Sequence, residues 1–202
     1  MAEVIKKPVI GTHNSMTYLP PARWYMWFMI PFARCQRAAI EEQWKAGARV
    51  FDIRLRFDRE GNLSYAHGLY HCRRSKAPGL CDLLGKLQKW QTDSGEQVYV
   101  RLILEDSQKE YYQASYFIDL CAELEDLFPG LTFYGGNRKG DWKKLWKFRG
   151  DVDDTLNNQW VSSMAEDARW YEKALPFAYA RRCNKRNKEG VRQIFNLFDF
   201  LK

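Results

Sequence analysis

The sequence predicts an α/β fold, because short apolar strand patterns alternate with amphipathic helix patterns from one end of the chain to the other. About seven strand candidates in 202 residues suit a small, distorted TIM-like (β/α) barrel better than a sandwich. Ionisable residues follow several of these strands, and the carboxyl ends of barrel strands form the active-site face. An open α/β sheet is the alternative.

The first elements are predicted from a change of period along the chain. The run PVIGTH at 8–13 is typical of a short buried strand that ends at its polar residues. Helical spacing over 35–49 contains a stop signal at Gly47, and RVFDIRLRF at 49–57 then alternates strictly, as a strand with two different faces does. The run LSYAHG at 63–68 predicts a second strand beside it, as a hairpin or near neighbour.

The rest of the chain continues the alternation less cleanly. The strongest pattern is VYVRLILE, an apolar run at 98–105 that predicts a buried strand. The other elements that we expect are helices at 80–90, 112–128, 141–148 and 165–183, the last broken near Pro176, and strands at 131–136, 158–163 and 191–201.

Composition favours one domain over 1–202 and an anionic partner. The chain is 46% hydrophobic and 15% aromatic, enough for one packed core, and we expect a monomer. Its net charge of +7 favours phosphates, nucleic acid or acidic lipid surfaces. No motif interleaves the basic residues with groups that read bases, so we expect no nucleic-acid partner.

The opening residues and the cysteines indicate a reducing compartment. The run MAEVIKKPVIGTH has no apolar segment with a cleavage site, so we expect no signal peptide and a cytoplasmic or peripheral membrane location. The five cysteines are odd in number and irregularly spaced, and they lack both a CxxC motif and an evident set of histidine partners. The sequence therefore predicts free thiols and no zinc site.

An uncharged aromatic segment, WYMWFMIPFA at 24–33, is the one membrane-like stretch of the sequence. A transmembrane helix needs about 20 apolar residues, and Pro31 interrupts this run. It is expected to lie on a membrane surface rather than to cross the bilayer, because amphipathic aromatics beside arginines suit an anionic interface. The alternative is an ordinary core helix of the barrel wall.

Polar residues fall at or near the ends of five predicted strands. Each has an ordinary structural explanation, such as a turn, a helix cap or the solvated face of a strand. Together they favour a site, since charged residues inside a barrel need a reason to be there. They are His13, Asp52 with Arg54, His67, Glu105 and Asp199.

This set of side chains suits phosphoryl transfer. Two histidines on opposite sides of a phosphate can act as general base and general acid. An arginine between them offers a planar fork for phosphate oxygens, and an aspartate can hold the tautomer of the base. The residues alone therefore predict a phosphodiesterase.

The blocks VIGTHNSMTY, AGARVFDIRLRF, LSYAHGLY, VYVRLILED and IFNLFDFL, in this order, resemble the X domain of bacterial phosphatidylinositol-specific phospholipases C. The resemblance implies a distorted (β/α) barrel and a cyclic inositol phosphate product. It implies that His13 takes the proton of the inositol 2-hydroxyl and that His67 protonates the departing diacylglycerol oxygen. Arg54 would bind the phosphate, with Asp52 beside it, and Asp199 would pair with His13.

The resemblance also suggests residues around this catalytic set. Asn14, which follows the base, joins the catalytic residues. The expected phosphate- or substrate-binding residues are Arg56, Glu105, Arg138 and Trp160, with Lys139 and Gln159 as further candidates. Family members carry a short lipid-contacting helix after the base, and the corresponding residues here are Trp24, Tyr25, Trp27 and Phe28.

The expected enzyme cleaves a phosphoinositide or a related phosphodiester without a metal or another cofactor. Asn14 and Glu105 resemble the calcium-dependent type, so Ca²⁺ is the alternative cofactor. Arg54, however, stands where that type needs a carboxylate, and a guanidinium there repels a dication. The expected partners are a phospholipid or inositol-phosphate substrate and a membrane surface. The alternative function is a non-catalytic module that binds phospholipid or phosphate on the same barrel.

Overall fold

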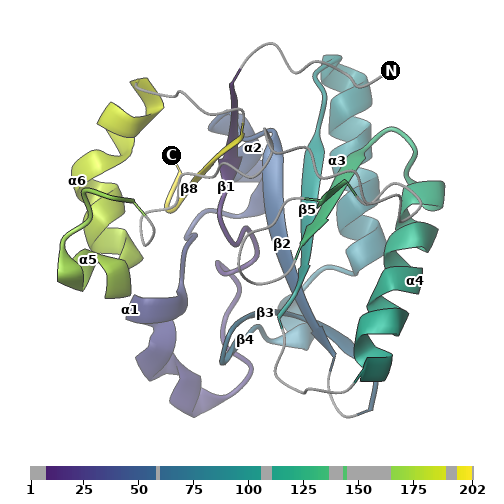
Figure 1. Ribbon diagram of the computed structural model, residues 1–202, viewed down its shortest axis with the longest axis horizontal. Helices are drawn as coiled ribbons and strands as arrows, with labels where there is room; N and C mark the ends of the chain where they lie inside the picture. Colours follow the sequence, from purple (N-terminus) through teal and green to yellow (C-terminus); the bar gives the residue numbers. More distant parts are fainter. Residues whose placement is uncertain are drawn as a thin grey trace.

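The computed structural model describes residues 8–57, 60–105, 111–136, 143–144, 165–189 and 195–201, and Figure 1 shows their arrangement. In chain order the elements are β1 (Val9–Thr12), η1 (Trp24–Met29), α1 (Ile30–Ala33), α2 (Ile40–Lys45), β2 (Val50–Phe57), β3 (Leu63–His67), β4 (Tyr70–His71), η2 (Arg74–Lys76), α3 (Leu80–Ser94), β5 (Tyr99–Leu104), α4 (Tyr111–Leu127), β6 (Thr132–Gly136), β7 (Lys143–Lys144), α5 (Trp170–Ala174), α6 (Pro176–Glu189) and β8 (Phe195–Phe198).

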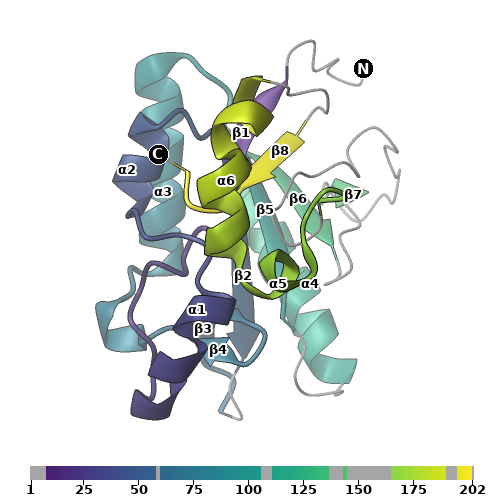
Figure 2. The same ribbon diagram turned by 90° about the vertical axis from the view of Figure 1, so that its left-hand side faces the viewer.

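Five parallel strands form the centre of the sheet, in the order β8-β1-β2-β5-β6. The strands β3 and β4 extend β2 in antiparallel fashion, and β7 pairs antiparallel with β6. Helices α3 and α4 cover the side of the sheet near β5, whereas α5 and α6 lie on the side of β8 and α1 (Figures 1 and 2). Among the described residues no pairing joins β8 to β6 or β7, so this part of the barrel is not closed.

Register places one face of all five parallel strands toward the barrel interior. Toward one end this face is apolar, where Tyr99 and Phe195, the first residues of β5 and β8, and Tyr134 in the middle of β6 contact one another ring to ring. Two residues further along, the same alternation brings Asp52 of β2 opposite Arg101 of β5. The interior is therefore apolar at one end and charged toward the carboxyl ends of the strands.

The other face of the sheet forms the main hydrophobic core. Phe51, Ile53 and Leu55 of β2 point into it, and α3 and α4 bring apolar side chains against them. This is the apolar side of the alternation in RVFDIRLRF. Gly11 of β1 allows the strands to approach closely, because a Cβ there would come 2.6 Å from the backbone oxygen of Val50.

The predicted α/β barrel-type fold and most of its elements are confirmed, with three differences. The antiparallel pairing of β3 with β2 confirms the predicted hairpin. The helix expected at 35–49 is the shorter α2, and the strand β4 was not predicted. Lys143 and Lys144 form a strand where a helix at 141–148 was predicted, because they pair with Tyr134 and Gly135 of β6. The rest of that prediction, and the strand at 158–163, lie outside the described residues.

Candidate active site

His13 directly follows β1, and two hydrogen bonds determine which of its ring nitrogens carries a proton. Its Nδ1 lies 2.7 Å from Oδ1 of Asp199, and because a carboxylate accepts, Nδ1 carries the hydrogen. Its Nε2 lies 2.8 Å from Nη2 of Arg54, which can only donate. His13 therefore presents an unprotonated Nε2, the form that a general base needs.

Arg54 connects the charged residues of three strands. Its Nε donates to Asp52 at 3.0 Å, its Nη1 donates to Glu105 at 2.8 Å, and its Nη2 reaches His13. Burial alone would lower the pKa of Arg54, but the two carboxylates outweigh it and raise the pKa above its usual range. A fixed guanidinium thus has one edge toward His13, and its planar N–H groups are of the kind that binds anionic oxygens.

Asp52 is fully buried, with two hydrogen bonds to one carboxylate oxygen and an ion pair to the other. The backbone N–H of Asn14 donates to its Oδ2 at 2.9 Å, beside the bond from Arg54, and Nη1 of Arg101 lies 3.5 Å from its Oδ1. Burial raises the pKa of this carboxyl, but the guanidiniums of Arg54 and Arg101 more than offset it and bring the pKa to about 2. Asp52 is therefore a fixed negative charge that orients Arg54 and the turn after His13.

His67 ends β3 on the other side of the site, with its ring centroid 5.8 Å from that of His13. Its Nδ1 lies 2.7 Å from the carbonyl oxygen of Ala33, so Nδ1 donates and Nε2 is the atom that gains or loses a proton. Burial, followed by the charges of Arg54 and His13, lowers the pKa of His67 to about 4. His67 is therefore neutral at pH 7 in the unliganded protein.

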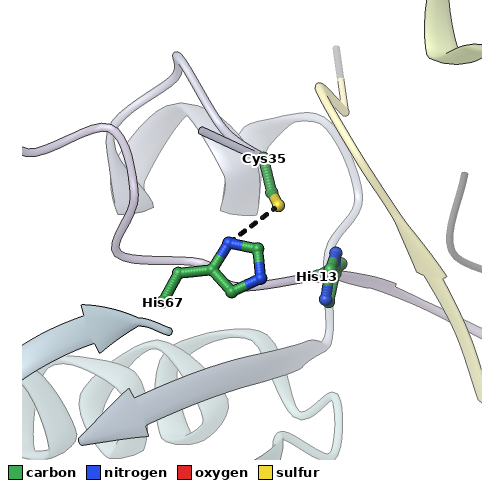
Figure 3. Close-up of side chains that lie close together, drawn as sticks. All are labelled: His13, Cys35 and His67. Atoms are coloured by element: carbon green, nitrogen blue, oxygen red, sulfur yellow. Dashed lines mark hydrogen bonds between the residues drawn. The ribbon is translucent and has the colours of Figure 1, made fainter. Parts of the chain in front are cut away.

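Two neighbours of the site, Cys35 and Gln36, had no signal in the sequence. The amide nitrogen of Gln36, Nε2, donates to the carbonyls of His13 at 3.0 Å and Phe198 at 2.7 Å. It thereby joins the turn that begins at His13 to the end of β8, which Asp199 follows. Cys35 is fully buried with its Sγ 3.8 Å from Nδ1 of His67, as Figure 3 shows. The sequence analysis also missed Arg101, which lies opposite Asp52 in the pairing of β5 with β2.

The other predicted site residues are placed as follows. Asn14 is 1% exposed with a positive φ, and its Nδ2 has no hydrogen-bond partner among the described residues, which leaves a donor for an anion. Arg56 donates to the carbonyl of Gly68 and to Nε2 of His71, on the β3–β4 side. Two more predicted residues, Arg138 and Trp160, lie outside the described residues, as do Lys139 and Gln159.

The aromatic segment is exposed rather than buried in the barrel wall. The exposed fraction is 76% for Trp24 and Phe28 and 53% for Trp27, and Tyr25 is also exposed. Only Met26 of η1 is buried. The core-helix alternative is therefore wrong for these side chains. The segment leads directly into the site, because the carbonyl that receives the His67 hydrogen bond belongs to the last residue of α1.

The fold matches that of known enzymes over almost the whole chain. The phosphatidylinositol-specific phospholipase C of Listeria monocytogenes is 18% identical, with a TM-score of 0.54 over 98% of this chain and 90% of that one. One structure of the Staphylococcus aureus enzyme is 15% identical, with a TM-score of 0.56 over 98% of this chain and 87% of that one. A second structure is 16% identical, with a TM-score of 0.57 over 95% of this chain and 85% of that one. The chain has the fold of these phospholipases.

The likeness lies in the fold and not in overall sequence similarity. No protein-family model and no curated protein matches the sequence. The resemblance that the short motifs suggested is thus confirmed by the arrangement of the whole chain. Among the described residues no helix is long and apolar enough to cross a membrane.

Proposed function

We propose that this protein is a phosphodiesterase of the phospholipase C type that cleaves a phosphoinositide or a related phosphodiester. One observation carries the proposal. At the carboxyl ends of the parallel strands, His13 bonded to Asp199 faces His67, with Arg54 fixed beside it. General base, general acid and phosphate-binding cation are thus present within one buried cluster. The named activity of the structures with the same fold points to the same chemistry.

The proposed mechanism begins when the phosphate displaces the bond between Arg54 and His13. An anionic phosphate oxygen takes Nη2 of Arg54, which frees Nε2 of His13 to accept the proton of a neighbouring hydroxyl of the substrate. The resulting oxyanion attacks phosphorus and forms a cyclic phosphodiester. His67, protonated on Nε2, gives its proton to the departing alcohol oxygen, and Asp199 stabilises the imidazolium that forms on His13.

The donor set also supports a reaction without calcium. Asn14, Asp52 and Glu105 supply oxygens that calcium could use, but the guanidinium of Arg54 is bonded to both carboxylates. A dication among these oxygens would have to displace Arg54 against its charge. The residues do not fit a resident calcium ion, and no step of the proposed mechanism uses one.

Hydrolysis of phosphatidylinositol in mixed vesicles tests the proposal. We expect release of diacylglycerol and a cyclic inositol phosphate, and no release from phosphatidylcholine, whose headgroup has no hydroxyl placed to attack phosphorus. Binding of phosphatidylinositol vesicles without turnover would instead identify the non-catalytic lipid-binding module. Absence of both binding and turnover would contradict both functions.

The pKa of His67 predicts that binding takes up a proton. A general acid must be protonated, and an anionic phosphate beside His67 raises its pKa from about 4. The affinity for a non-hydrolysable inositol phosphonate monoester should therefore rise as the pH falls from 7 to 5. Calorimetry at pH 6 in two buffers of different ionisation enthalpy should show uptake of a fraction of one proton. Equal uptake in His67→Gln, or an affinity independent of pH in this range, would contradict the assignment.

The exposed aromatic segment predicts a membrane-binding surface. Trp24→Ala with Trp27→Ala removes two exposed indoles, and we expect vesicle affinity to fall by about tenfold or more, since indole rings suit the bilayer interface. Turnover of a soluble inositol phosphodiester should change less than twofold. The control, Tyr116→Ala with Leu127→Ala, removes exposed apolar groups from α4, on the opposite side of Figure 1 from α1. Equal loss of vesicle binding in both pairs would contradict a specific surface.

A further inference from the structure

The fold brings together three side chains that the sequence did not suggest as metal ligands. His13 follows β1, Cys35 follows α1 and His67 ends β3, and Figure 3 shows them side by side. One ligand atom of each lies within 4.8 Å of the other two. The expectation that the cysteines lack histidine partners is therefore wrong for Cys35, because residues distant in sequence meet at this end of the sheet.

The spacing of these atoms is close to that of a tetrahedral metal site. Zinc binds thiolate sulfur at about 2.3 Å and imidazole nitrogen at about 2.0 Å, so its ligand atoms lie roughly 3.3–3.6 Å apart. Sγ of Cys35 and Nδ1 of His67 are already 3.8 Å apart. The ligand atom of His13 lies within 4.8 Å of the other two, so it has to move closer to them for a metal to bind all three.

Asp199 supplies a second, independent observation at the same place. It is 1% exposed, and while its Oδ1 binds His13, its Oδ2 has no hydrogen-bond partner among the described residues. Burial, and next the charge of Asp199, raise the pKa of the Cys35 thiol well above its usual range. Asp199 thus places a buried carboxylate against two members of the cluster, the Cys35 thiol and the His13 ring, which favours a cation there.

Two existing contacts oppose a cation and determine how tightly the site can bind it. Arg54 carries a positive charge 2.8 Å from Nε2 of His13, and Nδ1 of His67 must leave the carbonyl of Ala33 if it becomes the ligand. Both contacts reduce the affinity for a metal. The cation would therefore bind reversibly and not as a permanent part of the fold.

We propose that His13, Cys35 and His67 form an inhibitory site for a thiophilic divalent cation such as Zn²⁺, with solvent as the fourth ligand. The thiol loses its proton to solvent when the metal–sulfur bond forms. With the metal bound, neither His13 nor His67 can exchange a proton with substrate. The inhibition rests on the proposed function, whereas the binding of the metal does not.

Cobalt absorption spectroscopy on the full chain tests the site without reference to activity. Co²⁺ should give the ultraviolet charge-transfer band of a cobalt–thiolate bond, and added Zn²⁺ should remove it by displacement. Cys35→Ser and Cys35→Ala should each lose the band and bind Zn²⁺ about 100-fold more weakly. The matched control is Cys72→Ser, another buried free cysteine, which should keep the band. Thermal unfolding of each variant establishes that it is folded.

Absence of the band in the wild-type protein, or a band unchanged in a folded Cys35 variant, would overturn the proposal. In the phosphatidylinositol assay, Zn²⁺ should inhibit the wild type, and a chelator should restore its rate. Relative to its own metal-free rate, Cys35→Ser should require at least about tenfold more Zn²⁺ for the same inhibition. Equal sensitivity would also overturn the proposal. If the wild type has no turnover, the proposed function fails, and the cobalt band alone decides the metal site.

Discussion

Replacing His13 with alanine is expected to reduce turnover of phosphatidylinositol by about 10²–10⁴-fold, the contribution of a well-placed general base. The variant loses the imidazole whose unprotonated nitrogen lies against Arg54, where the substrate phosphate is proposed to bind. His67→Ala should cause a loss of similar size, because it removes proton donation to the leaving group. Initial rates on mixed vesicles measure both effects.

The third histidine provides a matched control for these variants. His71 of β4 pairs with Arg56 of β2, and among the described residues it makes no hydrogen bond with His13, Arg54 or His67. His71→Ala should therefore keep turnover within a few-fold of the wild type. A substrate with a good leaving group, such as a nitrophenyl phosphodiester of inositol, should partly rescue His67→Ala and not His13→Ala. Near wild-type rates in either folded variant would contradict the assigned roles.

The second large effect is expected at Arg54. Arg54→Lys keeps a positive charge but loses the planar fork, and we expect a fall in turnover of about 10²–10³-fold. The reason is that a lysine ammonium cannot contact Asp52, Glu105 and a phosphate with the same fixed geometry. Excess chelator should leave the wild-type rate unchanged, because Arg54 occupies the space between the carboxylates.

Two controls belong to this test: a conservative change at another arginine, and the addition of calcium after chelation. Arg49→Lys alters an arginine that binds Glu96 away from the cluster, and its rate should stay close to wild type. A rate that disappears in chelator and returns with Ca²⁺ would show that the metal-independent mechanism is wrong. Equal small losses in Arg54→Lys and Arg49→Lys would show that Arg54 does not stabilise the reacting phosphate.

Much of the candidate site was predictable because the alternation of side chains along a strand determines which face each residue points to. In RVFDIRLRF the polar residues alternate with the apolar ones, so they point to the face opposite Phe51 and Ile53. Asp52 and Arg54 therefore share one face, whatever the position of the strand in the sheet. Parallel pairing then brings the ends of neighbouring strands together. The pairing of His13 with Asp199, which the resemblance to the phospholipases implied, agrees with the 2.7 Å contact, although the two residues are 186 positions apart.

The sequence by itself determined most of the strands, their polar and apolar faces, and which ionisable residues stand on the polar faces or at the ends, since these depend on local period. Only the tertiary structure decided what else meets them. Cys35 and Gln36 lie where the sequence predicted the start of a helix, and only the path of the chain between α1 and α2 places them against His67 and His13. The exposure of Trp24 was likewise undecided, because an uncharged aromatic run fits a core or a surface equally well until its neighbours are known.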